Sequence, residues 1–260
     1  MNKGVAITGM GIISSIGNSV EENFYSLTNN KTGLSDIENI QTVHDNLKFG
    51  EIKKTNEQLI AELGISPNNN FTRTALLGVF AAKQAVENAG ISSINEYKTG
   101  LISSTSVGGM DTTEKHYFDY FNDDNLIKYI SSHDAGNVSH QIADELGLKG
   151  MVTTISTACS SAANAIMMGA RLIKSGKLDR VIVGGTDALA KFTINGFKTL
   201  MILNEGYNMP FDNDRKGLNL GEAAAYLVLE SEENIKKENK KVLARVSGYG
   251  NANDAFHQTA

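Results

Sequence analysis

The stretch from Val152 to Ile166 joins a predicted strand to a predicted helix through a run of small residues that contains one cysteine. Its first part, Val152 to Ile155, is rich in β-branched residues, which favour a strand. From Ser160 to Ser175, apolar residues recur at the spacing of a helix. Cys159 lies at the junction, and its small neighbours permit a tight turn with an accessible sulfur atom. The chain must therefore contain a strand–turn–helix unit with Cys159 at the turn.

The position of Cys159 has chemical consequences. The first N–H groups of a helix have no partner within the helix, and the helix macrodipole is positive at that end. Both effects favour thiolate over thiol, and the same N–H groups can stabilise a developing oxyanion. An arbitrary cysteine is more often a small buried apolar residue. The strand-to-helix context instead favours a nucleophile.

Strands and helices alternate along the rest of the chain. Apolar and β-branched runs predict strands at 4–8, 99–103, 180–185, 223–230 and 242–248. Helical spacing and capping residues predict helices at 18–27, 56–63, 71–89, 137–146, 160–175 and 231–241, with largely helical segments at 111–136 and 188–203. This order predicts the α/β class, as a mixed β-sheet covered by helices. No low-complexity linker marks a domain boundary.

The glycines at Gly9 and Gly11 follow the first predicted strand, as in dinucleotide-binding proteins. The third position of that fingerprint is Ser14, no helix begins there, and no clear acidic residue follows at the required distance. We therefore expect a sharp turn and close backbone packing at these glycines. His133 and His140 have no second metal-type residue at ligand spacing. The sequence predicts neither a cofactor nor a metal.

Charge and cysteine content narrow the class of protein. The formal net charge of −5 argues against a nucleic-acid partner. One cysteine excludes an intramolecular disulfide and suits a reducing compartment. The first residues lead straight into a strand without a signal-peptide core, and no apolar run approaches the length of a membrane span. We expect a cytoplasmic protein with no membrane span.

Six short segments, in order along nearly the whole chain, give it a family resemblance. The chain resembles β-ketoacyl-[acyl-carrier-protein] synthases, most closely the elongating enzymes of type II fatty acid or polyketide synthesis. The matching segments are 5–11 (VAITGMG), 156–162 (STACSSA), 183–188 (VGGTDA), 210–217 (PFDNDRKG), and 221–225 (GEAAA) with 253–257 (NDAFH).

The resemblance implies a thiolase-like fold built from two similar α/β halves. Residues 1–241 would form the N-terminal half with the nucleophile, and residues 242–260 would begin the C-terminal half. It also implies that Cys159 accepts an acyl group from an acyl carrier protein and condenses it with a decarboxylating malonyl carrier, without metal or redox cofactor. A homodimer is implied as well.

The resemblance extends to further site residues. Val107, Gly108 and Phe197 match positions that line the acyl pocket. Tyr129 matches a residue that reaches into the pocket of the partner subunit across a two-fold dimer, and His257 matches a histidine near the start of the second half.

Three features depart from the family pattern. The two catalytic histidines and the lysine of the family belong to the second half, and none of the chain's five histidines (44, 116, 133, 140 and 257) lies in a motif that matches those two. We therefore expect that these 260 residues alone do not catalyse condensation. Asn68 to Asn70 replace the basic residues that usually precede the long helix, so docking of an acidic carrier there is weakened. Alanines follow Glu222 where glycine is common.

Two other functions stay open. The chain can be a non-catalytic partner subunit, similar to a chain length factor, that pairs with an active synthase; Cys159 argues against this, because such partners typically lack the cysteine. It can also be a thiolase-type or initiating acyltransferase. The 210–217 motif favours the carrier-dependent elongating branch instead.

Overall fold

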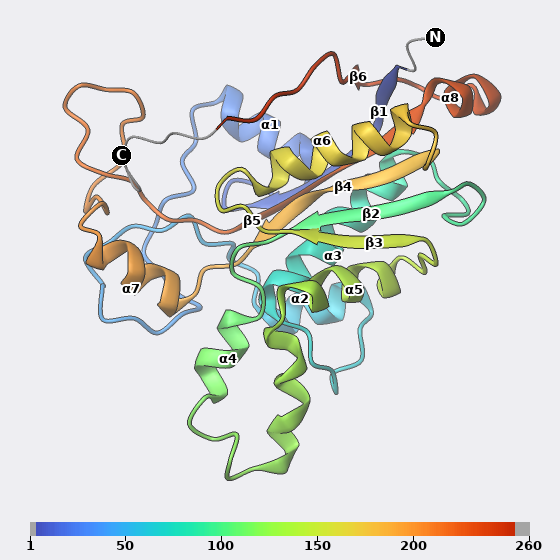
Figure 1. Cartoon of the computed structure of the whole chain (residues 1–260). Helices are drawn as coiled ribbons and strands as arrows, with labels where there is room; N and C mark the ends of the chain where they lie inside the picture. Colours follow the sequence, from blue (N-terminus) through green and yellow to red (C-terminus); the bar gives the residue numbers. More distant parts are fainter. Residues whose placement is uncertain (1–3, 253–260) are drawn as a thin grey trace.

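The computed structural model describes residues 4–252, and its centre is a six-stranded sheet (Figure 1). The strand order is β3-β2-β4-β5-β1-β6. β2 pairs in parallel with β3 and β4, whereas β5 is antiparallel to β4 and β1, and β6 is antiparallel to β1. The predicted mixed sheet is confirmed. The strands are β1 (Val5–Ser14), β2 (Thr99–Ser104), β3 (Met151–Ile155), β4 (Arg180–Asp187), β5 (Ala223–Ser231) and β6 (Ala244–Arg245).

Helices cover both faces of the sheet (Figure 1). α6 (Ser161–Lys174) packs on one face against β4 and β2. α3 (Arg73–Asn88) and α5 (Ala135–Glu145) pack on the other face, with α2 (Asn56–Leu63) against α3. The remaining helices are α1 (Val20–Thr28), α4 (Met110–His116), α7 (Lys191–Thr199), α8 (Glu232–Glu238) and two 3₁₀ helices, η1 (Asp124–Tyr129) and η2 (Ser131–His133).

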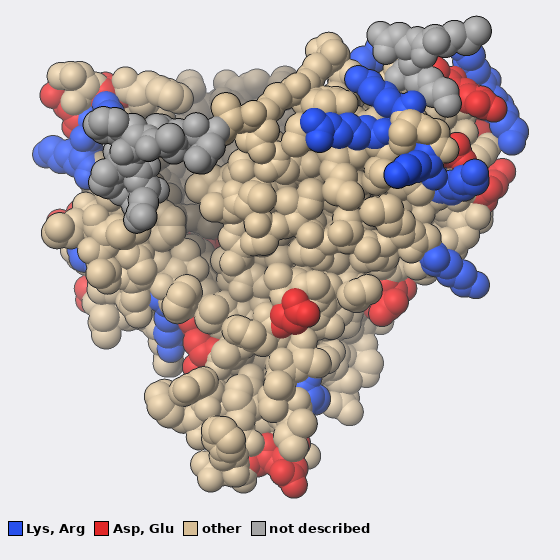
Figure 2. Space-filling model, viewed as in Figure 1, with Lys and Arg blue, Asp and Glu red and all other residues tan. Residues whose placement is uncertain are grey.

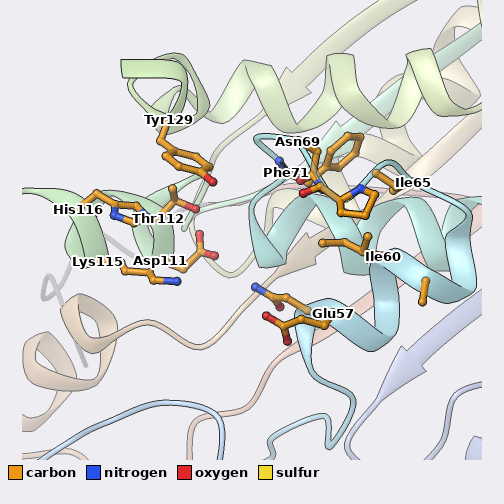
Figure 3. Close-up of a pocket in the computed structure, with 13 residues that line it drawn as sticks. Glu57, Ile60, Ile65, Asn69, Phe71, Asp111, Thr112, Lys115, His116 and Tyr129 are labelled. Atoms are coloured by element: carbon orange, nitrogen blue, oxygen red, sulfur yellow. Dashed lines mark hydrogen bonds between the residues drawn. The ribbon is translucent and has the colours of Figure 1, made fainter. Parts of the chain in front are cut away.

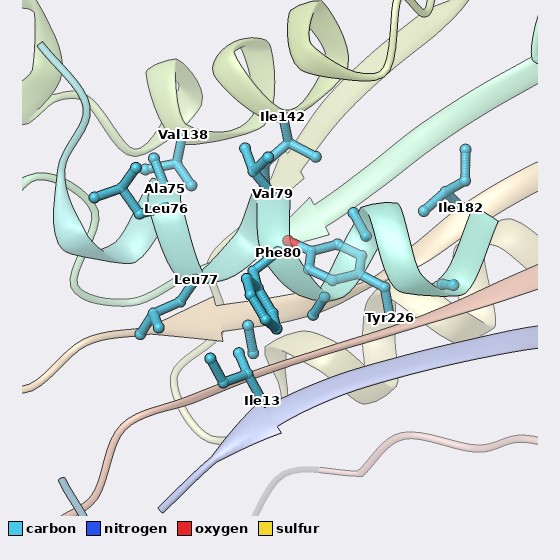
Figure 4. Packing of buried hydrophobic residues seen from close by; sticks show 14 of the residues in the cluster. Ile13, Ala75, Leu76, Leu77, Val79, Phe80, Val138, Ile142, Ile182 and Tyr226 are labelled. Carbon is cyan, nitrogen blue, oxygen red and sulfur yellow. The ribbon is translucent and has the colours of Figure 1, made fainter. Parts of the chain in front are cut away.

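The larger core forms around α3, whose residues 73–82 are all buried and are mostly small or apolar (Figure 4). Leu76, Leu77 and Val79 are fully buried, and Phe80 packs in the same cluster. Tyr226 of β5 lies in this cluster and shares a hydrogen bond with Ser103 of β2 at 2.5 Å between the two hydroxyl oxygens. The apolar spacing that predicted a buried helix at 71–89 is therefore confirmed.

The predicted turn at Gly9 and Gly11 is wrong, because β1 continues through both residues to Ser14. The close packing predicted there is confirmed. A Cβ atom at Gly9 would lie 2.3 Å from the Ala85 carbonyl oxygen, and one at Gly11 would lie 2.2 Å from the Ala81 carbonyl oxygen. The glycines thus let α3 lie directly on β1.

Two other predicted elements are shorter than expected. Within 242–248 only Ala244–Arg245 forms a strand, paired with β1 at the edge of the sheet. The segment 111–136 contains only short helices, because its polar composition supplies no continuous apolar face. Residues 110–133, which contain α4, η1 and η2, form a protruding arm that we call the 110–133 arm (Figure 1).

Candidate active site

Cys159 lies between β3 and α6, as its sequence context predicted. The turn is strained at Ala158, whose φ is +51°, a left-handed value that costs about 1–2 kcal/mol for a residue with a side chain. The Ser161 hydroxyl closes the turn: it accepts a hydrogen bond from the Thr157 N–H at 2.8 Å and donates one to the Ala158 carbonyl at 2.6 Å. We call residues 157–161 the nucleophile turn. It holds the Cys159 side chain exposed at the start of the helix.

The cysteine faces an open hollow of about 490 Å³. Small residues at the carboxyl ends of β1, β2 and β4 and at the first residue of β5 line it, because these four ends meet at one edge of the sheet. Ligands of α/β proteins bind at such edges. The lining residues are Ser14, Ser15, Ile16, Gly50, Ser104, Ala158, Cys159, Ser161, Ala162, Gly185, Thr186, Asp187, Gly221, Glu222 and Ala223.

A buried ion pair supports one wall of the hollow. The Glu222 carboxylate has no exposed surface and binds the Arg73 guanidinium, with Nε 2.9 Å from Oε2 and Nη2 2.5 Å from Oε1. The same carboxylate accepts the N–H groups of Ile52 at 3.0 Å and Leu189 at 3.1 Å. Arg73 also donates to the carbonyl oxygens of Ile52 and Lys54. One pair therefore joins three loops to the start of α3.

Of the predicted site residues that the structure describes, only Cys159 lines the hollow. Val107 and Gly108 lie in the loop after β2 and are not among the lining residues, although the Val107 N–H donates to Asp187, which does line the hollow, at 2.9 Å. Phe197 is half-buried on α7 and is not among the lining residues. His257 lies outside the described residues.

Tyr129 lies in a second cavity, of about 390 Å³, between the 110–133 arm and α2 (Figure 3). Its ring stacks on His116 with the centroids 4.8 Å apart. Burial lowers the pKa of His116 and raises the pKa of Asp111, which lines the same cavity. Asp111 Oδ2 accepts the Arg73 N–H at 2.8 Å, so this cavity and the Cys159 hollow lie on either side of Arg73.

Within residues 4–252, no histidine lines the hollow. His44 contacts Asn195 and His133 contacts Thr113, both away from Cys159. Over the same residues, no group of histidine, cysteine and carboxylate side chains is arranged to hold a metal ion. The described helices include none with the length and apolar character to cross a membrane.

The sequence analysis assigned no role to three charged residues: Asp187 and Glu222, which line the hollow, and Arg73, which is paired with Glu222 behind it. Asp187 and Glu222 lie inside motifs that the sequence comparison used, and these motifs were the available signal. Their contacts involve residues 33 to 170 positions away, which no local pattern shows.

Comparisons with known proteins agree with this geometry. Residues 2–234 match the model of the β-ketoacyl synthase N-terminal domain. The 3-oxoacyl-[acyl-carrier-protein] synthase 2 of Vibrio cholerae is 29% identical over 98% of this chain and 64% of its own length. The protein of the same name from Staphylococcus aureus is 31% identical over 100% of this chain and 65% of its own. The chain thus spans just under two thirds of these relatives.

Solved structures show the same fold. The ishigamide ketosynthase/chain length factor superposes with a TM-score of 0.87 at 28% identity, over 96% of this chain and 64% of that one. A ketosynthase in complex with its chain length factor from Xenorhabdus doucetiae gives a TM-score of 0.74 at 26% identity, over 88% and 58%. The predicted thiolase-like fold is confirmed.

Proposed function

This chain belongs to the β-ketoacyl synthase family through its N-terminal domain, and we propose that Cys159 holds the acyl group during elongation of a fatty acid or polyketide chain. The Cys159 thiolate attacks the carbonyl carbon of an acyl-carrier thioester and releases the carrier thiol. A malonyl carrier then loses carbon dioxide, and its enolate attacks the acyl-cysteine carbonyl. The products are a 3-oxoacyl carrier and the regenerated thiolate.

The exposed sulfur of Cys159 at the start of α6 is the observation that supports this function most directly. α6 has 14 residues, so its free N–H groups and dipole favour negative charge at the nucleophile turn. Covalent catalysis of this kind divides one difficult step into two easier ones. The open hollow beside Cys159 gives the acyl carbonyl access to the sulfur.

Acylation and condensation are separable in this proposal. Decarboxylation of the malonyl carrier needs groups that stabilise an enolate, which the family places on two histidines. Among residues 4–252 the hollow contains none, so we expect the chain alone to accept an acyl group but not to form the 3-oxo product.

The partners in this proposal are an acyl carrier protein with a phosphopantetheine thioester and a second copy of this chain, in the cytoplasm. Apolar side chains on the 110–133 arm support the second copy, because large apolar residues exposed together mark interaction surfaces. The exposed residues of the arm are Tyr117, Phe118, Phe121, Ile127 and Ile130.

The two parts expected from the sequence remain part of the proposal, with 1–241 as the N-terminal half and 242–260 as the start of the second. Two observations support it. The sheet is complete through β5 and α8 before residue 241, and β6 adds only a two-residue pairing. Few charged side chains lie across the middle of the face that α6 covers (Figure 2), as expected of a surface that packs against another layer.

Mass spectrometry of the chain after incubation with an acyl carrier thioester tests the function. We expect the acyl mass on the peptide that contains Cys159, and no adduct on the Cys159→Ser variant. No adduct on the unmodified chain, in parallel with a synthase that is acylated, would favour the alternative of a non-catalytic partner similar to the chain length factors. Acylation by acyl-coenzyme A alone, and not by the carrier, would favour a thiolase-type acyltransferase.

A further inference from the structure

Asp187, the last residue of β4, holds the loop that follows β2. Its Oδ1 atom accepts three hydrogen bonds from that loop: from the N–H groups of Ser106 at 2.8 Å and Val107 at 2.9 Å, and from the Thr105 hydroxyl at 2.6 Å. Hydrogen bonds to an ionised acceptor are about twice as strong as neutral ones. We call residues 105–109, which connect the end of β2 to α4 at the base of the 110–133 arm, the wall loop.

The wall loop is fixed by other contacts as well. The Gly108 N–H donates to the Thr105 hydroxyl at 2.9 Å, and φ of Gly108 is +57°, which closes the loop on itself. Gly109 packs on η2 so closely that a Cβ atom there would lie 1.8 Å from the Ser132 carbonyl oxygen. The arm therefore fixes one side of the loop, and Asp187 fixes the other.

The wall loop also contacts the nucleophile turn. The Ser106 hydroxyl donates to the Ala158 carbonyl at 3.4 Å, one residue before Cys159. An acyl group on Cys159 would extend along a hollow that Ser104 and Asp187 line. None of residues 105–109 lines the hollow itself, but the loop is bound to Asp187, so its position determines where the Asp187 side chain stands in the hollow.

We propose that Asp187 is a positioning residue that sets the length of the acyl group accepted at Cys159, an inference that rests on the proposed function. Asp187 acts through the Ser106 and Val107 amides and does not itself bind the acyl chain. With the loop held in place, acyl groups beyond a certain length meet the wall. With the three hydrogen bonds removed, the loop can move away from the hollow and admit longer groups.

Acylation of Cys159 by pantetheine thioesters from acetyl to palmitoyl, measured by mass spectrometry of the Cys159 peptide, tests this proposal. In Asp187→Ala we expect the ratio of long-chain to short-chain acylation to rise at least about ten-fold, since loss of three hydrogen bonds of modest net strength corresponds to at least about a factor of ten in the population of the moved loop. Asp187→Asn keeps an acceptor oxygen but loses the negative charge, so its ratio should lie between those of the unmodified chain and Asp187→Ala. Asp179→Ala is the matched control, because Asp179 also accepts a backbone N–H, from Lys98 at 3.3 Å, but is not among the residues of the hollow.

Hydrogen exchange of the Ser106 and Val107 amides distinguishes local movement of the wall loop from a general loss of stability, which would speed exchange throughout the chain. We expect faster exchange at these two amides in Asp187→Ala, relative to amides of α3. An unchanged acylation ratio despite faster exchange would show that the loop does not set the length. A changed ratio with both amides still protected would show that Asp187 contacts the acyl chain directly.

A third probe separates this inference from the proposed function. If the unmodified chain is not acylated by any thioester, the proposed function fails. Alkylation of Cys159 by maleimides of increasing size then tests the wall loop by itself. The inference requires Asp187→Ala to react faster than the unmodified chain with large maleimides only, and equal rates at every size would overturn it.

Discussion

Replacing Ser161 by alanine should open the nucleophile turn. The Ser161 side chain is buried, and its hydroxyl makes two hydrogen bonds, at 2.8 Å and 2.6 Å, that hold Ala158 at φ +51°. Net loss of these bonds costs about 1–2 kcal/mol. The left-handed conformation of Ala158 itself stores about 1–2 kcal/mol, so the turn has a comparable driving force to relax once the hydroxyl is gone. The two terms together are large enough to change the predominant conformation of the turn.

Two measurements follow from this reasoning. The melting temperature of Ser161→Ala should fall by about 5 °C, because about 1 kcal/mol shifts a domain of this size by roughly 2–4 °C. The second-order rate of Cys159 alkylation by iodoacetamide should fall by about ten-fold, because the sulfur leaves the helix start in the relaxed turn. Ser161→Thr retains the hydroxyl and should restore most of both.

Ser175→Ala is the control, since Ser175 bonds the Leu172 carbonyl at 3.0 Å at the exposed far end of α6. We expect its melting temperature and its alkylation rate to match those of the unmodified chain. The reasoning is refuted if Ser161→Ala alkylates at the unmodified rate while its melting temperature has fallen. The hydroxyl would then stabilise the fold without shaping the nucleophile turn.

Three more perturbations test the fold around the site. Glu222→Gln leaves the buried Arg73 charge without its counter-ion and should cost about 3–5 kcal/mol in urea unfolding, whereas a change below about 1 kcal/mol would contradict a structural role for the pair. Gly11→Ala should destabilise the chain by on the order of 3 kcal/mol in the same assay, because the added Cβ atom would overlap the backbone of α3. Its control is Gly196→Ala on α7, where the added Cβ atom would have no neighbour from another part of the chain within 4 Å. This variant should instead stabilise the chain by up to about 1 kcal/mol. The pKa of Glu238 is lowered by hydrogen bonds and ion pairing that outweigh its partial burial, so its ionised form stabilises the fold above pH 4.5 and that contribution is lost as the pH falls through the lowered pKa. Glu238→Gln should therefore be less stable than the unmodified chain at pH 7 and approach it at pH 3, and a difference that is equal at both pH values would rule out the ionic contribution.

Local patterns predicted those parts of the fold that depend on neighbours in sequence. The helix at 56–63 begins after the Thr55 capping box and ends before Gly64, and both signals lie directly next to the helix in the sequence. The run of small apolar residues in α3 predicted its burial, and residues 73–82 are all buried, whereas Glu87 and Asn88 at its end are exposed. The same local reasoning placed Cys159 at the start of α6.

Local sequence patterns could not predict which distant segments of the chain contact one another. β5 lies between β4 and β1, so strands far apart in the sequence are neighbours in the sheet. β1 continues through Gly9 and Gly11 because β5 pairs with it along its whole length, a contact that the first residues do not indicate. The role of Asp187 toward Ser106 and Val107 likewise depends on how β2 and β4 lie side by side.

The sequence by itself determined the α/β class, the strand-to-helix position of Cys159 and the buried face of α3. Hydrophobic spacing, capping and turn chemistry act over a few residues, so they are present in the order of the amino acids. Only the tertiary structure decided which strand ends surround the sulfur and which charges hold the walls of the hollow. Those choices depend on hydrogen bonds and ion pairs between residues far apart in the sequence, such as Ile52 and Glu222 at 170 positions and the paired Ser14 and Ala223 at 209 (223 − 14), whose partners become neighbours only when the sheet has formed.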